Sequence, residues 1–455
     1  MTDEPDTAAT GDSTTPETYY FVSDLHVGGD EQLGQVEFLD ELLAFLRDLE
    51  RRDEDAELVI NGDAFGLWEF TQVDGVEKFD VLLDRYPDLF EQLRATGETT
   101  PITLIPGNHD YELAAHDEYV ERLAEYNVTL EQAVSITRRV GDHVVYVEHG
   151  MQRDPGNRIP DFGNPYANPP GYFVNRQITS RAGRLSRRGR YDWLKDIQAV
   201  TPMTLIPEWM LSNYFYREMS PWLRYASVPF LLLFNLGILY LVTVLLDVTG
   251  VWGAPMTAVE GALGLFGPVG LAVNVVLAVN LVVVLLLALL SVPLYVFVRD
   301  LRKTLRRFGL VRPATERDPD EPYLDAAREA FAADPEVAVF VYGHTHRGSL
   351  TTVGERVVLN TGTWLKRLRR VEVPLGVLPP VFYASYRLDC FRLSPAEDGS
   401  VVVDHDTVPK DDPADETLLE RLLTRSPAPL EPVPDRTVVA PGTDRGVGSD
   451  GRDDG

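Results

Sequence analysis

The chain has 455 residues, 44% of them hydrophobic, which is enough for one large domain or two ordinary ones and excludes a wholly disordered protein. Its formal net charge of −28 argues against a general nucleic-acid-binding protein, which normally carries a basic surplus. Arginine far outnumbers lysine, and this acidic, lysine-poor composition is typical of salt-adapted organisms such as halophilic archaea. The single cysteine, Cys390, excludes an internal disulfide and a cysteine-rich metal site. Its apolar surroundings predict a buried strand residue.

Residues 1–17 are acidic and lack the basic and apolar segments of a signal peptide, so we expect a disordered leader. Residues 18–150 alternate short apolar strands with amphipathic helical patterns, and residues 337–404 continue mainly with strands. An α/β fold is therefore expected, with one mixed sheet or two packed sheets flanked by helices. The patterns predict strands at 19–23, 58–60, 102–105, 143–147, 337–342, 356–359, 381–393 and 401–404, and helices at 31–52 and 75–96.

Residues 151–226 begin a long insertion that is rich in proline, arginine and aromatic residues. A basic cluster within it permits two interpretations. Its forked guanidinium groups could bind a phosphate or anionic headgroup of a substrate, or the segment could be a solvated or lipid-facing basic loop. The candidate substrate-binding residues are Arg176, Arg181, Arg184, Arg187 and Arg188.

Residues 227–298 contain two apolar runs, at 228–246 and 269–298, each long enough to cross a bilayer. With a short loop between them they predict a transmembrane helical hairpin, although a buried core helix is the alternative for the first run. The loop at 247–268 contains neither lysine nor arginine, whereas basic residues flank both runs. By the positive-inside rule the α/β domain should therefore lie in the cytoplasm of a protein with two membrane spans.

Two further segments complete the predicted organisation. Residues 299–336 form a basic juxtamembrane helix and linker, whose cationic face could contact anionic lipid headgroups. Residues 405–455 are acidic and rich in proline, and are expected to be a disordered tail with one short helix at 416–423.

Five polar motifs each follow a predicted strand directly, where α/β folds gather their catalytic loops. They contain five of the eight histidines in the chain. Carboxylate, imidazole and amide groups without thiolates suit Mn, Fe or Zn. One such motif alone is weak, but five in this order are specific for a metal site. In chain order they are Asp24-x-His26, Gly62-Asp63, Gly107-Asn108-His109-Asp110, His149-Gly150 and Gly343-His344-x-His346.

This set of motifs resembles the calcineurin-like metallophosphoesterase superfamily over residues 19–150 and 337–404. The resemblance implies a four-layer αββα sandwich with a centre of two divalent metal ions, manganese being expected and iron or zinc being the alternatives. It implies that one ion is held by Asp24, His26 and His346. It implies that the other is held by Asn108, His149 and His344. Asp63 would bridge the two ions.

The resemblance also implies a mechanism, in which a hydroxide that bridges the metals attacks phosphorus in line with the leaving oxygen. His109 would stabilise the transition state or protonate the leaving group. Asp110 would orient His109 or, alternatively, form the N-cap of a helix at 111–123.

A narrower similarity links the segment 61–68 and the run Gly343-His344-Thr345-His346-Arg347 to the UDP-2,3-diacylglucosamine pyrophosphohydrolases, which split a pyrophosphate bond of a nucleotide-linked lipid at the membrane surface. Met151 replaces the aspartate usual in that group, and the apolar hairpin is a further departure. We therefore carry over the chemistry and the lipid surface, but not the substrate.

These observations predict a phosphoesterase that cleaves a phosphodiester or pyrophosphate bond in a lipid-linked or membrane-proximal substrate. Its expected partners are a phosphorylated small molecule or lipid and the membrane, with no nucleic acid. A nuclease or nucleotide phosphodiesterase is the alternative enzyme, because such enzymes share the motifs. A non-catalytic membrane-tethered scaffold is the alternative from another class, and the retention of all seven ligands disfavours it.

Overall fold

A computed structural model describes residues 16–28, 36–179, 196–200, 205–251, 255–307, 320–373, 378–424 and 430–439. Its larger sheet has seven strands in the order β14-β13-β12-β1-β2-β3-β4. The strands β1 to β4 pair in parallel, whereas β12, β13 and β14 add antiparallel pairs, so the sheet is mixed. The bounds are β1 (Thr18–Val22), β2 (Ala56–Asn61), β3 (Ile102–Ile105), β4 (Val128–Leu130), β12 (Leu388–Pro395), β13 (Val401–Val408) and β14 (Arg436–Val439).

A second mixed sheet has five strands in the order β5-β6-β7-β9-β8. Its central strands β6, β7 and β9 are parallel, and β5 and β8 are antiparallel edge strands. A separate two-stranded sheet consists of β10 and β11. The bounds are β5 (Ser135–Val140), β6 (His143–Glu148), β7 (Val337–Tyr342), β8 (Ser349–Val353), β9 (Arg356–Asn360), β10 (Arg367–Val371) and β11 (Val381–Ser385).

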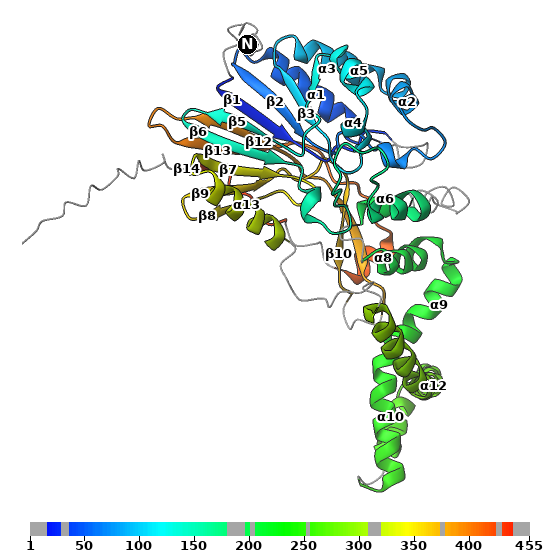
Figure 1. Ribbon diagram of the computed structural model, residues 1–455. Coiled ribbons are helices and arrows are strands. Elements are labelled where there is room, and N and C mark those ends of the chain that lie inside the picture. Colours follow the sequence, from blue (N-terminus) through cyan, green and yellow to red (C-terminus); the bar gives the residue numbers. More distant parts are fainter. Residues whose placement is uncertain are drawn as a thin grey trace, which may run out of the picture.

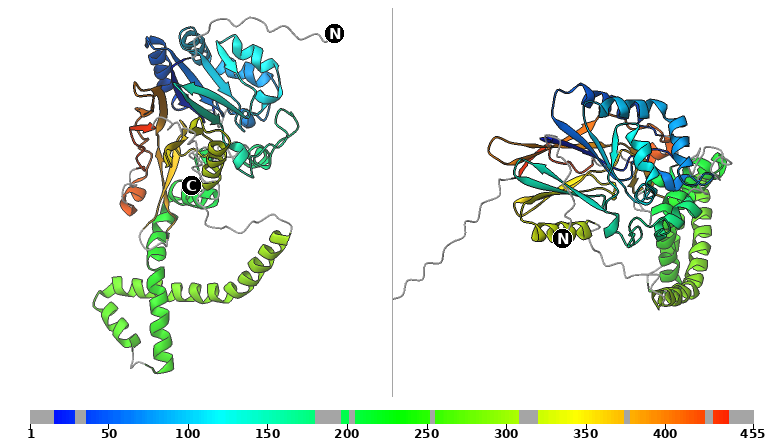
Figure 2. Two further views of the ribbon diagram at one scale, coloured as in Figure 1. Left: turned by 60° about the vertical axis from the view of Figure 1, so that its left-hand side comes forward. Right: turned by 45° about the horizontal axis from the view of Figure 1, so that its top comes forward.

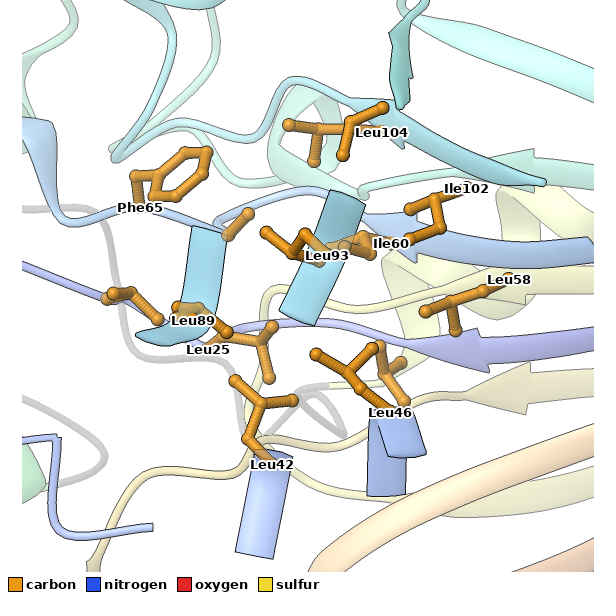
Figure 3. Packing of buried hydrophobic residues seen from close by; sticks show 14 of the residues in the cluster. Leu25, Leu42, Leu46, Leu58, Ile60, Phe65, Leu89, Leu93, Ile102 and Leu104 are labelled. Carbon is orange, nitrogen blue, oxygen red and sulfur yellow. The ribbon is translucent and has the colours of Figure 1, made fainter. Parts of the chain in front are cut away.

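These sheets and the helices pack in layers, which Figure 1 shows from the side, and three apolar cores hold the layers together. The helices α1 (Leu39–Arg51), α2 (Glu77–Arg85), α3 (Pro87–Gly97), α4 (Glu112–Ala115) and α5 (Glu118–Ala124) precede or follow the parallel strands of the seven-stranded sheet. In Figure 3, Leu93 of α3 lies beside Ile60 of β2, and Leu42 of α1 lies beside Leu25. A second core joins the two sheets, and α13 (Glu321–Ala333) covers the five-stranded sheet. The mixed α/β fold that the sequence predicts is confirmed.

Several expected elements differ from the structure. The helix predicted at 75–96 is divided into α2 and α3, because Pro87 starts a new helix and holds Tyr86 out of helical geometry, at φ −127° and ψ 50°. The strand predicted at 381–393 is divided into β11 and β12, which belong to different sheets. The expected disordered tail is wrong in part, because residues up to Val408 extend β13 and β14 pairs with that strand. The short helix expected at 416–423 is present as α14 (Leu418–Leu423), whose apolar side chains pack near Tyr383.

The insertion folds against the two-stranded sheet. It contains the short turns η2 (Met151–Arg153), η3 (Asn175–Thr179), η4 (Ile197–Ala199) and η6 (Tyr214–Glu218) and the helices α6 (Pro170–Val174) and α8 (Ile206–Asn213). Ser212 donates to the carbonyl of Pro380 at 2.6 Å, and Tyr216 donates to that of Pro379 at 2.8 Å. These contacts fix β10 and β11 between the large sheets and the apolar helices, as Figure 1 shows.

The apolar helices project from the body, and α12 crosses α10 (Figure 2). They are α9 (Pro221–Leu232), α10 (Phe234–Thr249), α11 (Pro255–Gly264) and α12 (Gly267–Arg307). Within the described residues one helix is long and apolar enough to cross a membrane, over the 34 residues Gly267–Asp300. The first predicted span is interrupted at Leu233, where Asn280 of α12 donates to the carbonyl of Phe230 at 3.2 Å. An unbroken helix would use that carbonyl itself.

Candidate metal centre

The five polar motifs all lie at the carboxyl ends of strands, as the sequence predicts. Asp24 lies two residues beyond β1, Asp63 two residues beyond β2, and Asn108 follows β3, all in the seven-stranded sheet. His149 follows β6 and His344 follows β7, both in the five-stranded sheet. Because the carboxyl ends of strands in both sheets lie at one edge, residues as far apart in the sequence as Asp24 and His346 meet there.

The predicted ligands form compact groups in the structure. Asp24, His26 and His346 offer ligand atoms that lie within 4.8 Å of one another. The same limit holds for Asp63 with His149 and His344, and for Asp63 with His26 and His109. Asp63 therefore lies between the two sets of residues, with its Oδ2 atom 3.6 Å from His26 Nε2 and 3.3 Å from His149 Nε2.

Backbone strain is concentrated at this site. Six non-glycine residues in the described ranges have positive φ, and five of them are predicted ligands. Such conformations are costly for residues with a Cβ and persist where the surrounding structure imposes them. The strained ligands are Asp24, His26, Asp63, His344 and His346, with φ between 46° and 67°.

Two glycines of the motifs permit the close approach of the ligand loops. Gly62 has a φ of +79°, and a Cβ at that position would overlap the ring of His149. A Cβ at Gly107 would overlap the carboxylate of Asp63. Larger residues at these two positions would therefore push the ligands apart.

The buried polar atoms of the site fit metal ions. Asn108 Oδ1 is buried and makes no hydrogen bond with the described residues. Asp24 Oδ1 and His149 Nε2 are also buried, and their close contacts are with other predicted ligands, His346 Nε2 at 3.1 Å and Asp63 Oδ2 at 3.3 Å. A buried polar atom without a partner is costly, so Asn108 Oδ1 is expected to have a ligand. Carboxylate oxygen, amide oxygen and imidazole nitrogen are the donors that borderline divalent metals accept.

Neighbouring groups orient the histidine rings. His149 Nδ1 lies 2.9 Å from the carbonyl of Asn61, which fixes a hydrogen on Nδ1 and directs Nε2 into the site. His344 Nε2 lies 3.1 Å from the carboxylate of Asp154 at the start of the insertion. Contacts of this kind usually hold metal-ligating histidines in place. The sequence analysis did not identify Asp154.

Carboxylates and histidines at the site shift the pKa values of one another. Burial would raise the pKa of Asp24, but His346 and His26 outweigh it and hold that pKa well below its usual range. Burial would lower the pKa of His149, but the carboxylates of Asp63 and Asp24 raise it to about 10. The carboxylates are therefore ionised, which is the form that binds a divalent cation.

The predicted catalytic residue His109 lies beside this centre, with its ring centroid 4.5 Å from that of His26. Glu69, at the end of η1 (Leu67–Glu69), places Oε1 2.8 Å from His109 Nδ1. Trp68 packs on the same ring at a centroid distance of 4.6 Å. Burial would lower the pKa of His109, but Glu69 and Asp63 raise it to about 9. The sequence analysis did not identify Glu69, because nothing in the local sequence distinguishes it from an ordinary residue of a surface turn.

Asp110 is buried and holds loops together. Its two oxygens accept hydrogen bonds from the backbone N–H groups of Gly107, at 2.6 Å, and Phe65, at 3.2 Å. Burial and the nearby Asp63 raise its pKa to about 7. The alternative that Asp110 is a helix N-cap is wrong, because α4 begins after Tyr111 and no side chain caps it.

A cavity of about 670 Å³ opens from the candidate metal centre. Its polar lining includes His26, Asp63, Asn108, His109, His344 and His346. Its apolar lining, called here the apolar wall, comes from the insertion and from β10 and the residues before it. The members of the apolar wall are Ile197, Val200, Leu205, Ile206, Leu365 and Leu368. Four arginines also line the cavity, namely Arg347, Arg367, Arg369 and Arg370.

The arginines that the sequence analysis singled out are elsewhere. Arg176 donates to Asp74 at 2.7 Å and to the hydroxyl of Tyr172 at 2.9 Å, and it does not line the cavity. Arg181, Arg184, Arg187 and Arg188 lie outside the described residues. Substrate binding by this cluster stays a prediction.

One comparison with known proteins found a family match. Residues 18–240, just under half of the chain, match the model of the calcineurin-like phosphoesterase family. The chain is similar to this family, whose members hydrolyse phosphoesters and use divalent metals. No curated protein matches the sequence.

Solved structures are similar only at a distance. An uncharacterized predicted phosphoesterase from Streptococcus pneumoniae is 10% identical with a TM-score of 0.25, over 89% of this chain and 97% of that chain. Vps29 from Entamoeba histolytica is 9% identical with a TM-score of 0.26, over 86% of this chain and 92% of that chain. Neither likeness bears on the function.

Proposed function

We propose that this protein hydrolyses a phosphodiester or pyrophosphate bond in a lipid-linked or membrane-proximal substrate, with two divalent cations, manganese being expected. One observation carries the proposal. Seven potential ligands from five strand ends converge at one edge of two sheets, and one of their atoms, Asn108 Oδ1, is buried without a hydrogen bond to the described residues. A purely structural cluster would satisfy that atom within the protein.

The residues divide between two cation positions. Asp24, His26 and His346 would hold one cation. Asn108, His149 and His344 would hold the other, and Asp63 would contact both. Cations there would neutralise charge on the phosphoryl oxygens and lower the pKa of an attacking water.

The chain itself supplies a proton donor. An ionised carboxylate only accepts hydrogen bonds, so Glu69 fixes a hydrogen on His109 Nδ1. The other ring nitrogen, Nε2, then carries the second proton of the imidazolium form toward the cavity. Proton donation from Nε2 to the leaving oxygen follows from this arrangement.

The apolar wall supports a substrate with a lipid portion. Leu205 and Ile206, which are partly exposed, come from the same insertion that carries the apolar helices, whereas Ile197 and Val200 are buried behind them. A hydrocarbon chain bound against Leu205 and Ile206 would leave water for an apolar surface, which is favourable. A substrate whose phosphoryl group meets the histidines would thus extend its apolar part along this wall.

The proposal also places the protein at a membrane. The long apolar helix α12 is not a core helix, since Leu285, Leu289 and Val292 are more than half exposed. An uncovered apolar surface of this extent is unusual in a soluble protein. We therefore propose that α12, with α10 beside it, anchors the protein, and that the flanking basic residues keep the catalytic domain in the cytoplasm.

The test is hydrolysis of bis(p-nitrophenyl) phosphate by detergent-solubilised protein that has been stripped of metal and then supplied with Mn²⁺. Turnover should depend on Mn²⁺ and be abolished in Asp63→Asn. The matched control Asp325→Asn, on the exposed face of α13, should retain it. Absence of turnover together with absence of bound metal would favour the scaffold. Efficient cleavage of DNA in the same preparation would favour the nuclease.

A further inference from the structure

The arginines of β10 have an unusual position in the cavity. Arg367 and Arg369 alternate with Leu368 and Arg370, so the two pairs project to opposite faces of the strand. On one face, Leu368 packs against Trp209 and Phe382, and Arg370 forms ion pairs with Glu208 and Glu372, both at 2.7 Å. The guanidinium group of Arg370 is therefore satisfied within the protein.

The opposite face lacks such partners. Within the described residues the side chains of Arg347, Arg367 and Arg369 have no ion pair and no hydrogen bond, although all three line the cavity. The acidic residues of the cavity already have partners, since Glu69 contacts His109 and Asp154 contacts His344. Three cationic groups thus lie together, and the acidic group that acts on Arg367, Asp389, is already paired with Arg387 at 2.9 Å.

The environment of Arg367 is unfavourable for a lone cation. Its side chain is half-buried, and burial together with the charges of Arg387 and Arg347 lowers its pKa to about 10. A half-buried cation beside like charges is stabilised by an anion, and a guanidinium group matches the oxygens of a phosphate in a bidentate geometry.

Rigid contacts connect this strand to the metal centre. Thr363, four residues before Arg367, donates from its hydroxyl to the backbone carbonyl of Asp24 at 2.7 Å. Thr361 lies 2.6 Å from Ser23, measured between the hydroxyl oxygens. The arginines are therefore held at a fixed separation from the ligand Asp24, which is what selection of a substrate by length requires.

We propose that Arg367, with Arg347 and Arg369, forms a second anion subsite, which binds a phosphoryl group of the substrate next to the one that is cleaved. For its role in catalysis this inference rests on the proposed function. It narrows the substrate to an amphiphile with two neighbouring anionic groups, one at the histidines and one at the arginines.

The subsite can be tested without turnover. Binding of pyrophosphate to metal-stripped protein is measured by titration calorimetry. Without metal, Asp24 and Asp63 repel anions from the candidate metal centre, and pyrophosphate has no metal ion to chelate. Arg367→Gln should weaken binding about tenfold, the typical effect of losing a charged hydrogen bond to phosphate. Arg370→Gln, on the paired face of the same strand, should leave the affinity within a factor of two. No binding to the native protein, or equal weakening in both variants, would overturn the subsite.

A second measurement addresses the substrate. With Mn²⁺ restored, the p-nitrophenyl ester of thymidine 5′-phosphate is compared with the same ester carrying a 3′-phosphate. The second phosphate should raise kcat/KM in the native protein, and Arg367→Gln should remove most of that gain. If both esters are hydrolysed and the ratio of their kcat/KM values is the same in the native protein and in Arg367→Gln, the subsite does not select the substrate, while the proposed hydrolysis still stands. Failure of both esters, with pyrophosphate binding intact, would instead contradict the proposed hydrolysis.

Discussion

Glu69 Oε1 lies 2.8 Å from His109 Nδ1, and the two residues come from loops that follow different strands. Asn175 of the insertion donates to the same oxygen of Glu69 at 3.0 Å. The insertion therefore takes part in positioning the proposed proton donor, as well as in forming the apolar wall.

Loss of the Glu69 charge should impair proton donation more than substrate binding. In Glu69→Gln we expect kcat to fall about tenfold to a hundredfold with little change in KM. Against the effect of burial, Glu69 and Asp63 together raise the pKa of His109 to about 9, so neutralisation of Glu69 lowers that pKa. His109 then loses its proton at lower pH, and the alkaline limb of the pH–rate profile moves to lower pH. The exposed pair Glu336 and Arg139 offers a control, since Glu336→Gln should leave the profile unchanged. An unshifted limb in Glu69→Gln would contradict this role.

Metal binding should release protons and strengthen as pH rises. In the absence of metal the pKa of His149 is about 10, so at neutral pH the ring carries a proton that a metal must displace. The affinity for Mn²⁺ should increase between about pH 6 and about pH 9, up to roughly tenfold per pH unit for each displaced proton. Calorimetry in two buffers with different ionisation enthalpies counts the protons. A pH-independent affinity would mean that metal binding displaces no proton from His149.

The contact between α10 and α12 depends on Gly237. A Cβ at this position would lie 2.8 Å from the Cβ of Asn280, the residue that bonds the carbonyl of Phe230. Gly237→Ala should therefore separate the helices and destabilise the protein in detergent by about 1–3 kcal/mol. Gly261→Ala is the matched control, because nothing lies within 4 Å of its Cβ position. Equal melting temperatures for the two variants would contradict the packing.

Cys390 should be chemically silent in the folded protein. Its side chain is only slightly exposed, and burial raises the pKa of the thiol above its ordinary range. The thiolate, which is the reactive form, is then scarce at neutral pH. A thiol reagent should label no cysteine in the native state and one per chain in denaturant. Rapid native labelling would show that β12 opens readily.

The sequence alone predicted the parts of the site that depend on local pattern. A short apolar run followed by a polar motif identifies a strand end, and every one of the five motifs lies at such an end. Asp24 and His346 are 3.1 Å apart in the structure, between Oδ1 and Nε2. Their meeting follows from two strands in different sheets, which periodicity does not reveal.

Other features depend on contacts between distant segments and could not be predicted. Glu69 and Asp154 gain their roles only when two loops approach the histidines. Arg367 and Arg369 resemble ordinary strand residues until the partners of Arg370 are known. The interruption at Leu233 depends on Asn280 of another helix, and the strand β14 depends on the edge of β13.

The central claim is that the clustered ligands hold two divalent ions joined by Asp63. The most direct measurement is equilibrium dialysis of metal-stripped protein against Mn²⁺, with bound metal counted per chain and its electron paramagnetic resonance spectrum recorded. We predict two ions per chain with a spin-coupled spectrum, and loss of the coupling in Asp63→Ala. No bound ion, or a single uncoupled ion in the native protein, would contradict the account.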